Sequence, residues 1–186
     1  MDNEINILIE KLNKGELILM KADDTWSIIC DAENNKAIEK LLSIKNNELD
    51  NPYVLLLDSE NQINKYVKEV PVIVWDVLSV ADKPLTIIYP QGINVSEKIL
   101  QKDRSIAIRI VKQGFCSLLI RKYRKPILAT WVCINKESIP LKFNKIDKNI
   151  ITKINYIFKR KEDDNYSKPA GILKFELNSE VKVLRI

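Results

Sequence analysis

The stretch Pro52-Tyr53-Val54-Leu55-Leu56-Leu57 is an apolar run that is followed at once by the polar residues Asp58-Ser59-Glu60. An apolar run of this length without alternation is typical of a strand buried on both faces of a sheet. The acidic and hydroxyl side chains after it favour the start of a helix, which we expect to continue to Tyr66. A buried strand that leads directly into a helix indicates an α/β fold.

The same alternation extends in both directions from this stretch. Helices are predicted over 4–14, 31–45, 71–80 and 113–124, and strands over 16–20, 26–30, 85–89, 105–110 and 126–132. Two strands, 172–177 and 181–186, end the chain, and residues 150–158 fit either a helix or a strand. We therefore expect one α/β domain over residues 1–186, with a twisted sheet of parallel and antiparallel strands flanked by helices.

Two residue types are scarce, and their scarcity excludes several kinds of site. The 186 residues include no histidine, so Ser-His-Asp and Cys-His catalytic groups and the usual histidine zinc sites are excluded. The four glycines are too far apart to form GxGxxG or GxxxxGK[ST], the common phosphate-binding loops. Any nucleotide must therefore be bound in another way.

Charge and cysteine content indicate the surroundings of the protein. The net charge of +5 favours anionic partners such as nucleotides or RNA, although a lysine-rich surface that is simply soluble remains an alternative. The densest basic cluster is Arg121-Lys122-Tyr123-Arg124-Lys125. An odd number of widely spaced cysteines fits a reducing compartment. With no predicted signal peptide or membrane span, we expect a cytoplasmic protein without a membrane partner.

Several short motifs occur in a characteristic order along the chain. Together they resemble the YrdC-like family, whose best-known members are threonylcarbamoyl-AMP synthases. The motifs are Asp31-Ala32-Glu33-Asn34, Ile44-Lys45, Asn51-Pro52, Lys83-Pro84-Leu85-Thr86-Ile87-Ile88, Ser105-Ile106-Ala107-Ile108-Arg109, Pro126-Ile127-Leu128-Ala129-Thr130 and Val183-Leu184-Arg185.

The resemblance implies a fold, a reaction and a set of ligand positions. It implies an open twisted sheet with a concave, positively charged face. It also implies synthesis of threonylcarbamoyl-AMP from ATP, threonine and bicarbonate, the first step of a tRNA modification at adenosine 37. Mg²⁺ would accompany the phosphates, without a protein-held metal. The positions matching the family's substrate or nucleotide ligands are Asp23, Lys45, Thr86, Arg109, Thr130 and Arg185.

At other positions the chain departs from the family pattern. Asn47 stands where the family has an arginine, Trp131 and Cys133 stand where it has serine and asparagine, and Ala170-Gly171 replaces a late hydroxyl pair. Losing the charged fork of an arginine from a phosphate costs about 1.5–3 kcal/mol, and a tryptophan fills space that serine leaves open. These changes predict an altered nucleotide site.

Three functions therefore remain open at the level of sequence. The first is an enzyme of the threonylcarbamoyl-AMP synthase type. The second is a non-catalytic YrdC-like module that binds double-stranded RNA, tRNA or a nucleotide. The third is a divergent adenylate-forming enzyme that uses another small acid, which the sequence does not separate from the second. The discriminating observation is whether the basic face beside Lys45 and Arg109 is open or is filled by Trp131.

Overall fold

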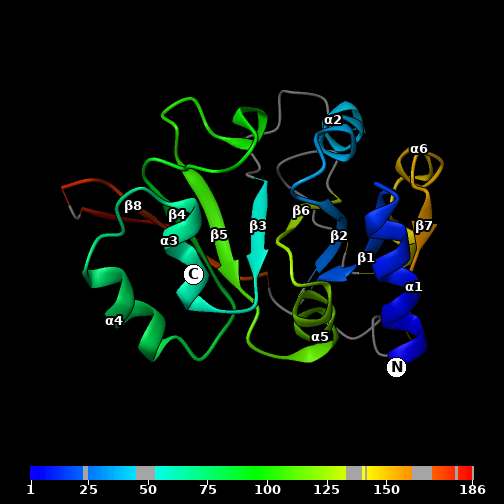
Figure 1. Cartoon of the computed structure of the whole chain (residues 1–186), viewed down its shortest axis with the longest axis horizontal. Coiled ribbons are helices and arrows are strands. Elements are labelled where there is room, and N and C mark those ends of the chain that lie inside the picture. The colour runs from blue at the N-terminus through cyan, green and yellow to red at the C-terminus, as the bar shows by residue number, and fades with distance from the viewer. Residues whose placement is uncertain are drawn as a thin grey trace.

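The computed structural model describes residues 1–22, 25–44, 53–132, 140, 142–160, 169–178 and 180–185. These residues form a nine-stranded sheet whose strands follow the order β7-β1-β2-β6-β3-β5-β4-β8-β9 (Figure 1). The strands are β1 (Ile18–Ala22), β2 (Thr25–Asp31), β3 (Val54–Leu57), β4 (Leu85–Tyr89), β5 (Ile106–Ile110), β6 (Ile127–Trp131), β7 (Tyr156–Ile157), β8 (Gly171–Phe175) and β9 (Val181–Arg185).

The helices confirm the predicted α/β class. They are α1 (Asp2–Asn13), α2 (Asn35–Ile44), α3 (Ile63–Tyr66), α4 (Ile73–Val80), α5 (Gly114–Tyr123) and α6 (Lys148–Ile151), with 3-10 turns η1 (Glu60–Gln62), η2 (Glu97–Ile99) and η3 (Phe143–Lys145). The helix expected over 58–66 is divided into η1 and α3, and the Ser59 side chain accepts the Asn61 N–H at its start. Residues 150–158, which fitted either element, contain the end of α6 and all of β7.

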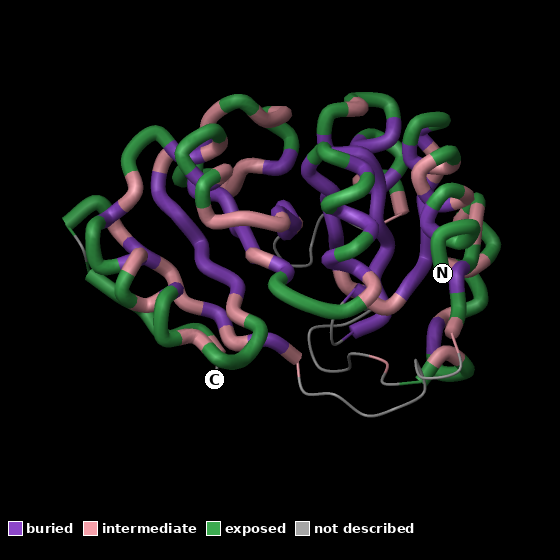
Figure 2. The backbone as a smooth tube through the Cα atoms, turned by 60° about the horizontal axis from the view of Figure 1, so that its bottom comes forward, coloured by how far each residue is buried: buried purple, intermediate pink, exposed green. Residues whose placement is uncertain are grey.

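Strand β3 lies inside the sheet, as its unbroken apolar run predicts. It pairs in parallel with β5 and antiparallel with β6, and all four of its residues are buried. The sheet is mixed: the pairs β1·β7 and β4·β8 are also parallel, whereas β1·β2, β2·β6, β4·β5 and β8·β9 are antiparallel. Figure 2 shows the buried strands at the centre and exposed backbone around the outer helices and turns.

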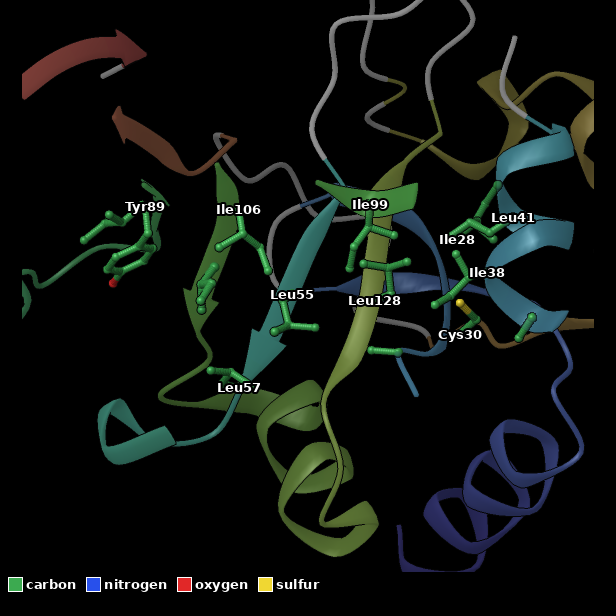
Figure 3. Close-up of a cluster of buried hydrophobic side chains, with 14 of the residues drawn as sticks. Ile28, Cys30, Ile38, Leu41, Leu55, Leu57, Tyr89, Ile99, Ile106 and Leu128 are labelled. Carbon is green, nitrogen blue, oxygen red and sulfur yellow. The ribbon is translucent and has the colours of Figure 1, made fainter. Parts of the chain in front are cut away.

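Two apolar clusters cover the two faces of the sheet. On one face, Leu55 and Leu128 pack with side chains from α2, α3 and α4. Figure 3 shows Ile38 and Leu41 of α2 close to Ile28 of β2 in this cluster. On the other face, alternate residues of the same strands pack with α1 and α5. Because side chains alternate along a strand, a residue's register decides which cluster it joins.

Residues in the sequence specify where α1 ends and where α2 begins. Gly15 follows α1 with a φ of +66°, the left-handed conformation that glycine adopts without strain. Before α2, the Asn34 Oδ1 accepts the N–H groups of Lys36 and Ala37, each at 3.1 Å. No helix in the described part of the chain is long and apolar enough to span a membrane.

Candidate anion-binding face

One row of cross-strand partners carries most of the predicted ligand residues that the structure describes. Arg185 of β9 pairs with Ile172 of β8, which pairs with Thr86 of β4, which pairs with Arg109 of β5. Residues directly opposite each other in a sheet project from the same face. The row therefore places Thr86 and Arg109 on one face, the face that carries the α1 and α5 cluster. The pairing of β8 with β9 shifts register beside Arg185, and the contact of Arg185 with Trp131 places it on the same face.

Arg109 and Thr86 form a buried pair at the middle of this row. The guanidinium Nε of Arg109 donates to the Thr86 hydroxyl over 3.0 Å. Arg109 is 3% exposed and Thr86 is fully buried. A guanidinium that is withdrawn from water and fixed by a hydroxyl is pre-organised to bind a carboxylate or phosphate, because its planar edge matches paired oxygens.

Trp131 belongs to the same face, nearer to β2. It ends β6 and pairs in register with Ser27, which is buried. Thr25 lies two residues before Ser27 on that face, and its buried hydroxyl has no hydrogen-bond partner among the residues that the structure describes. Thr25 was not among the predicted ligand residues. The sequence could have indicated it, because Thr25 and Ser27 are polar residues two positions apart in an apolar strand, a pattern that predicts polar side chains on one face of a sheet.

Arg185 connects the two parts of the face. Its guanidinium carbon lies 4.3 Å from the centroid of the Trp131 ring, and its Nε donates to the Ala170 carbonyl over 2.7 Å. Ala170 therefore contributes a backbone acceptor at the place where the family resemblance implies a side-chain hydroxyl. Gly171 opens β8 and pairs with Leu85, next to Thr86.

Thr130 lies on the opposite face of the sheet. It pairs with Ile28, and within the described part of the chain its buried hydroxyl has no hydrogen-bond partner. The sheet separates the Thr130 side chain from Arg109, since neighbouring strand residues project in opposite directions. The alternation along β6 was readable from sequence, because Thr130 and Trp131 are adjacent. The other predicted positions, Asp23, Lys45, Asn47 and Cys133, lie outside the described residues.

Among the described residues, neither the acidic side chains nor the cysteines are arranged for metal binding or nucleophilic catalysis. No three His, Cys, Asp or Glu side chains among them are grouped as metal ligands would be. Burial, with a smaller contribution from Asp31, raises the pKa of the Cys30 thiol to about 12, and Cys116 is also buried. A thiol that stays protonated at neutral pH does not act as a nucleophile.

The basic cluster on α5 is partly neutralised within the chain. The Lys122 Nζ lies 2.7 Å from the Asp2 carboxylate. Lys125 lies 3.6 Å from Asp31 and 3.4 Å from Glu33. Cations that already pair with carboxylates gain less from binding RNA phosphates, because the existing pairs must first be broken.

A family model described as telomere recombination, Sua5_yciO_yrdC, matches residues 10–186. The chain belongs to the Sua5/YciO/YrdC family. The resemblance that the sequence motifs indicated is thereby confirmed over nearly the whole chain.

Curated proteins with similar sequences include threonylcarbamoyl-AMP synthases. Threonylcarbamoyl-AMP synthase of Riesia pediculicola (strain USDA) is 30% identical over 155 residues, which are 77% of this chain and 83% of that protein. Threonylcarbamoyl-AMP synthase of Pseudoalteromonas translucida (strain TAC 125) is 24% identical over 148 residues, or 78% of this chain and 79% of that protein. This chain thus resembles threonylcarbamoyl-AMP synthases over most of their length.

Solved structures of the Sua5/YciO/YrdC family show the same fold. E. coli YciO matches all of this chain and 89% of its own, with a TM-score of 0.81 and 19% identity. P. abyssi Sua5 complexed with L-threonine matches 94% of this chain with a TM-score of 0.79 and 19% identity. The match covers 52% of that Sua5 chain, so the present chain spans about half of it.

Proposed function

We propose that this chain, acting as one YrdC-like domain, forms threonylcarbamoyl-AMP from ATP, threonine and bicarbonate. Its match to curated threonylcarbamoyl-AMP synthases over about four fifths of their length supports this reaction. The structural observation that carries the proposal is the buried Arg109–Thr86 pair on the sheet face that also holds Arg185. Two guanidinium groups on one face suit a reaction in which every substrate is anionic or carries a carboxylate.

The reaction divides into two steps that need positioning more than acid–base catalysis. The threonine amine adds to bicarbonate and water leaves, which forms a carbamate. An oxygen of that carbamate then attacks the α-phosphorus of ATP, and the bond to the bridging oxygen of pyrophosphate breaks. Negative charge increases on the phosphoryl oxygens during this second step, so fixed cations accelerate it. The absence of histidine from the sequence does not conflict with such chemistry.

Arg109 is the residue that we assign to the anionic substrates. The Thr86 hydroxyl accepts from its Nε over 3.0 Å and so fixes the plane of the guanidinium, whose planar shape suits paired phosphate or carboxylate oxygens. Thr86 is in this view a positioning residue. Mg²⁺ would enter with ATP and take its oxygen ligands mainly from the phosphates.

The proposed reaction also implies where its product goes and in which compartment the protein acts. The product would pass to a tRNA modification, and we place the reaction in the cytoplasm, where the buried thiols of Cys30 and Cys116 stay reduced. The alternative of an RNA-binding module is weakened at the basic cluster 121–125, because Lys122 of α5 and Lys125 after it are paired with carboxylates of this chain.

The test is release of pyrophosphate from ATP. We expect release to require threonine and bicarbonate together, and Arg109→Lys to lower kcat/KM by about a hundredfold, since lysine lacks the bidentate fork. Arg104→Lys is the matched control, because Arg104 is exposed, bonds Glu97 on the surface and should leave the rate unchanged. If no pyrophosphate is released above background at high enzyme concentration, the proposal is wrong.

A further inference from the structure

Trp131 and Arg185 are in contact although their strands are far apart in the sheet. Four strands, β3, β5, β4 and β8, separate β6 from β9. In a flat sheet the five strand spacings would put the two backbones about 24 Å apart. The guanidinium carbon nevertheless lies 4.3 Å from the indole centroid. The sheet is therefore strongly curled as well as twisted, and these two side chains meet on the inner side of the curve.

Each end of this bridge, the Trp131–Arg185 bridge, is supported by further contacts. Arg185 is held by the hydrogen bond from its Nε to the Ala170 carbonyl, 2.7 Å long. Trp131 is partly buried and packs against the apolar cluster of the same face. A guanidinium stacked over an indole and partly shielded from water is among the stronger cation–π arrangements. Further contacts therefore hold both the Arg185 and the Trp131 side chain in place.

The Trp131–Arg185 bridge crosses the face on which Arg109 and Thr86 lie. Arg185 stands in the same cross-strand row as Thr86 and Arg109. Trp131 lies on that face, two residues beyond Ala129 on β6. A large ligand that reaches Arg109 from this side must share the space with the indole.

We propose that Trp131 is a specificity-determining residue, whose indole is held over this face by Arg185 and must be displaced before a nucleoside group can enter. The contact then lowers the fraction of molecules that are competent to bind ATP, and the apparent dissociation constant rises in proportion. Ligands that consist of the phosphate chain alone need less space and are affected less. The inference rests on the proposed function in taking ATP as the nucleotide and Arg109 as the residue that binds its phosphates.

The experiment compares ATP with inorganic tripolyphosphate, which has the same phosphate chain without adenosine. Both affinities are measured by calorimetry for the wild type and for Trp131→Ala. We expect Trp131→Ala to bind ATP about tenfold more tightly, equivalent to about 1.4 kcal/mol, and tripolyphosphate less than twofold more tightly. Trp131→Phe, which keeps an aromatic ring, should lie between the two proteins. Trp75→Phe is the matched control, because Trp75 packs in the cluster on the other face.

The possible outcomes separate this inference from the proposed function. If Trp131→Ala binds ATP with unchanged or weaker affinity while it melts like the wild type, Trp131 does not exclude the nucleoside and the inference is wrong. In that case pyrophosphate release by the wild type would leave the proposed function intact. If tripolyphosphate binds and ATP binds to neither protein, both the inference and the proposed function are contradicted.

Discussion

At the scale of single residues, the buried Arg109–Thr86 pair contributes to stability through a hydrogen bond to a charged group. In Thr86→Val the valine side chain has nearly the shape of threonine but lacks the hydroxyl that accepts from the buried Arg109 Nε. We expect it to lower the free energy of unfolding by about 1.5–3 kcal/mol, as for other buried hydrogen bonds to charged groups. Urea denaturation measures the change. Thr86→Ser keeps the hydroxyl and should lose less, so equal losses in the two variants would contradict the assignment.

A second residue, Asp103, predicts how stability depends on pH. Burial raises the pKa of its carboxyl, but hydrogen bonds from Lys174 and Ser105 outweigh burial and hold this pKa at about 2. A carboxyl whose pKa is lower in the folded than in the unfolded state stabilises the fold above the unfolded value, near 3.9, and loses this effect as the pH falls.

The expected result is therefore a difference between wild type and Asp103→Asn that shrinks between pH 4 and pH 2. Thermal melting followed by circular dichroism at several pH values measures it. Lys174→Met should reproduce part of the loss, because Lys174 donates one of the hydrogen bonds. A difference that stays constant from pH 6 to pH 2 would show that Asp103 does not act through its charge.

At the scale of elements, helix α2 depends on the residue before it. Asn34 accepts two N–H groups at the start of α2, those of Lys36 and Ala37. Asn34→Ala should cost about 1 kcal/mol of stability in urea denaturation. Asn34→Asp retains an acceptor at the same place and should cost less. The assignment would be refuted by an alanine variant that is as stable as the wild type.

The helices and strands also show which parts of the fold can be predicted from sequence patterns. Strand β3 was predictable, because an unbroken apolar run fits a strand with neighbours on both sides. The helix after it was expected as one piece over 58–66, but the structure has η1 and α3, because local capping by Ser59 favours a tight turn that no periodicity reveals. Period-two alternation gives the face of Thr130, opposite to that of Trp131, once β6 is recognised.

At the scale of the whole molecule, the twist of the sheet determines which residues meet. The Trp131–Arg185 contact joins β6 to β9 across four intervening strands. Sequence patterns give the strands but not their order or the accumulated twist, so they do not predict this pair. The family resemblance does indicate Arg109 and Thr86 as candidates, and the register shows why these two meet, since β4 and β5 pair at these residues.

The most direct test of the account is to detect the product itself. Wild-type protein is incubated with ATP, threonine and isotopically labelled bicarbonate, and the nucleotides are separated and examined by mass spectrometry. The account predicts threonylcarbamoyl-AMP that carries the label in its carbamoyl carbon, formed in equal amount with pyrophosphate. An ATP pool that stays unchanged, or AMP and pyrophosphate formed equally well without threonine, would contradict it.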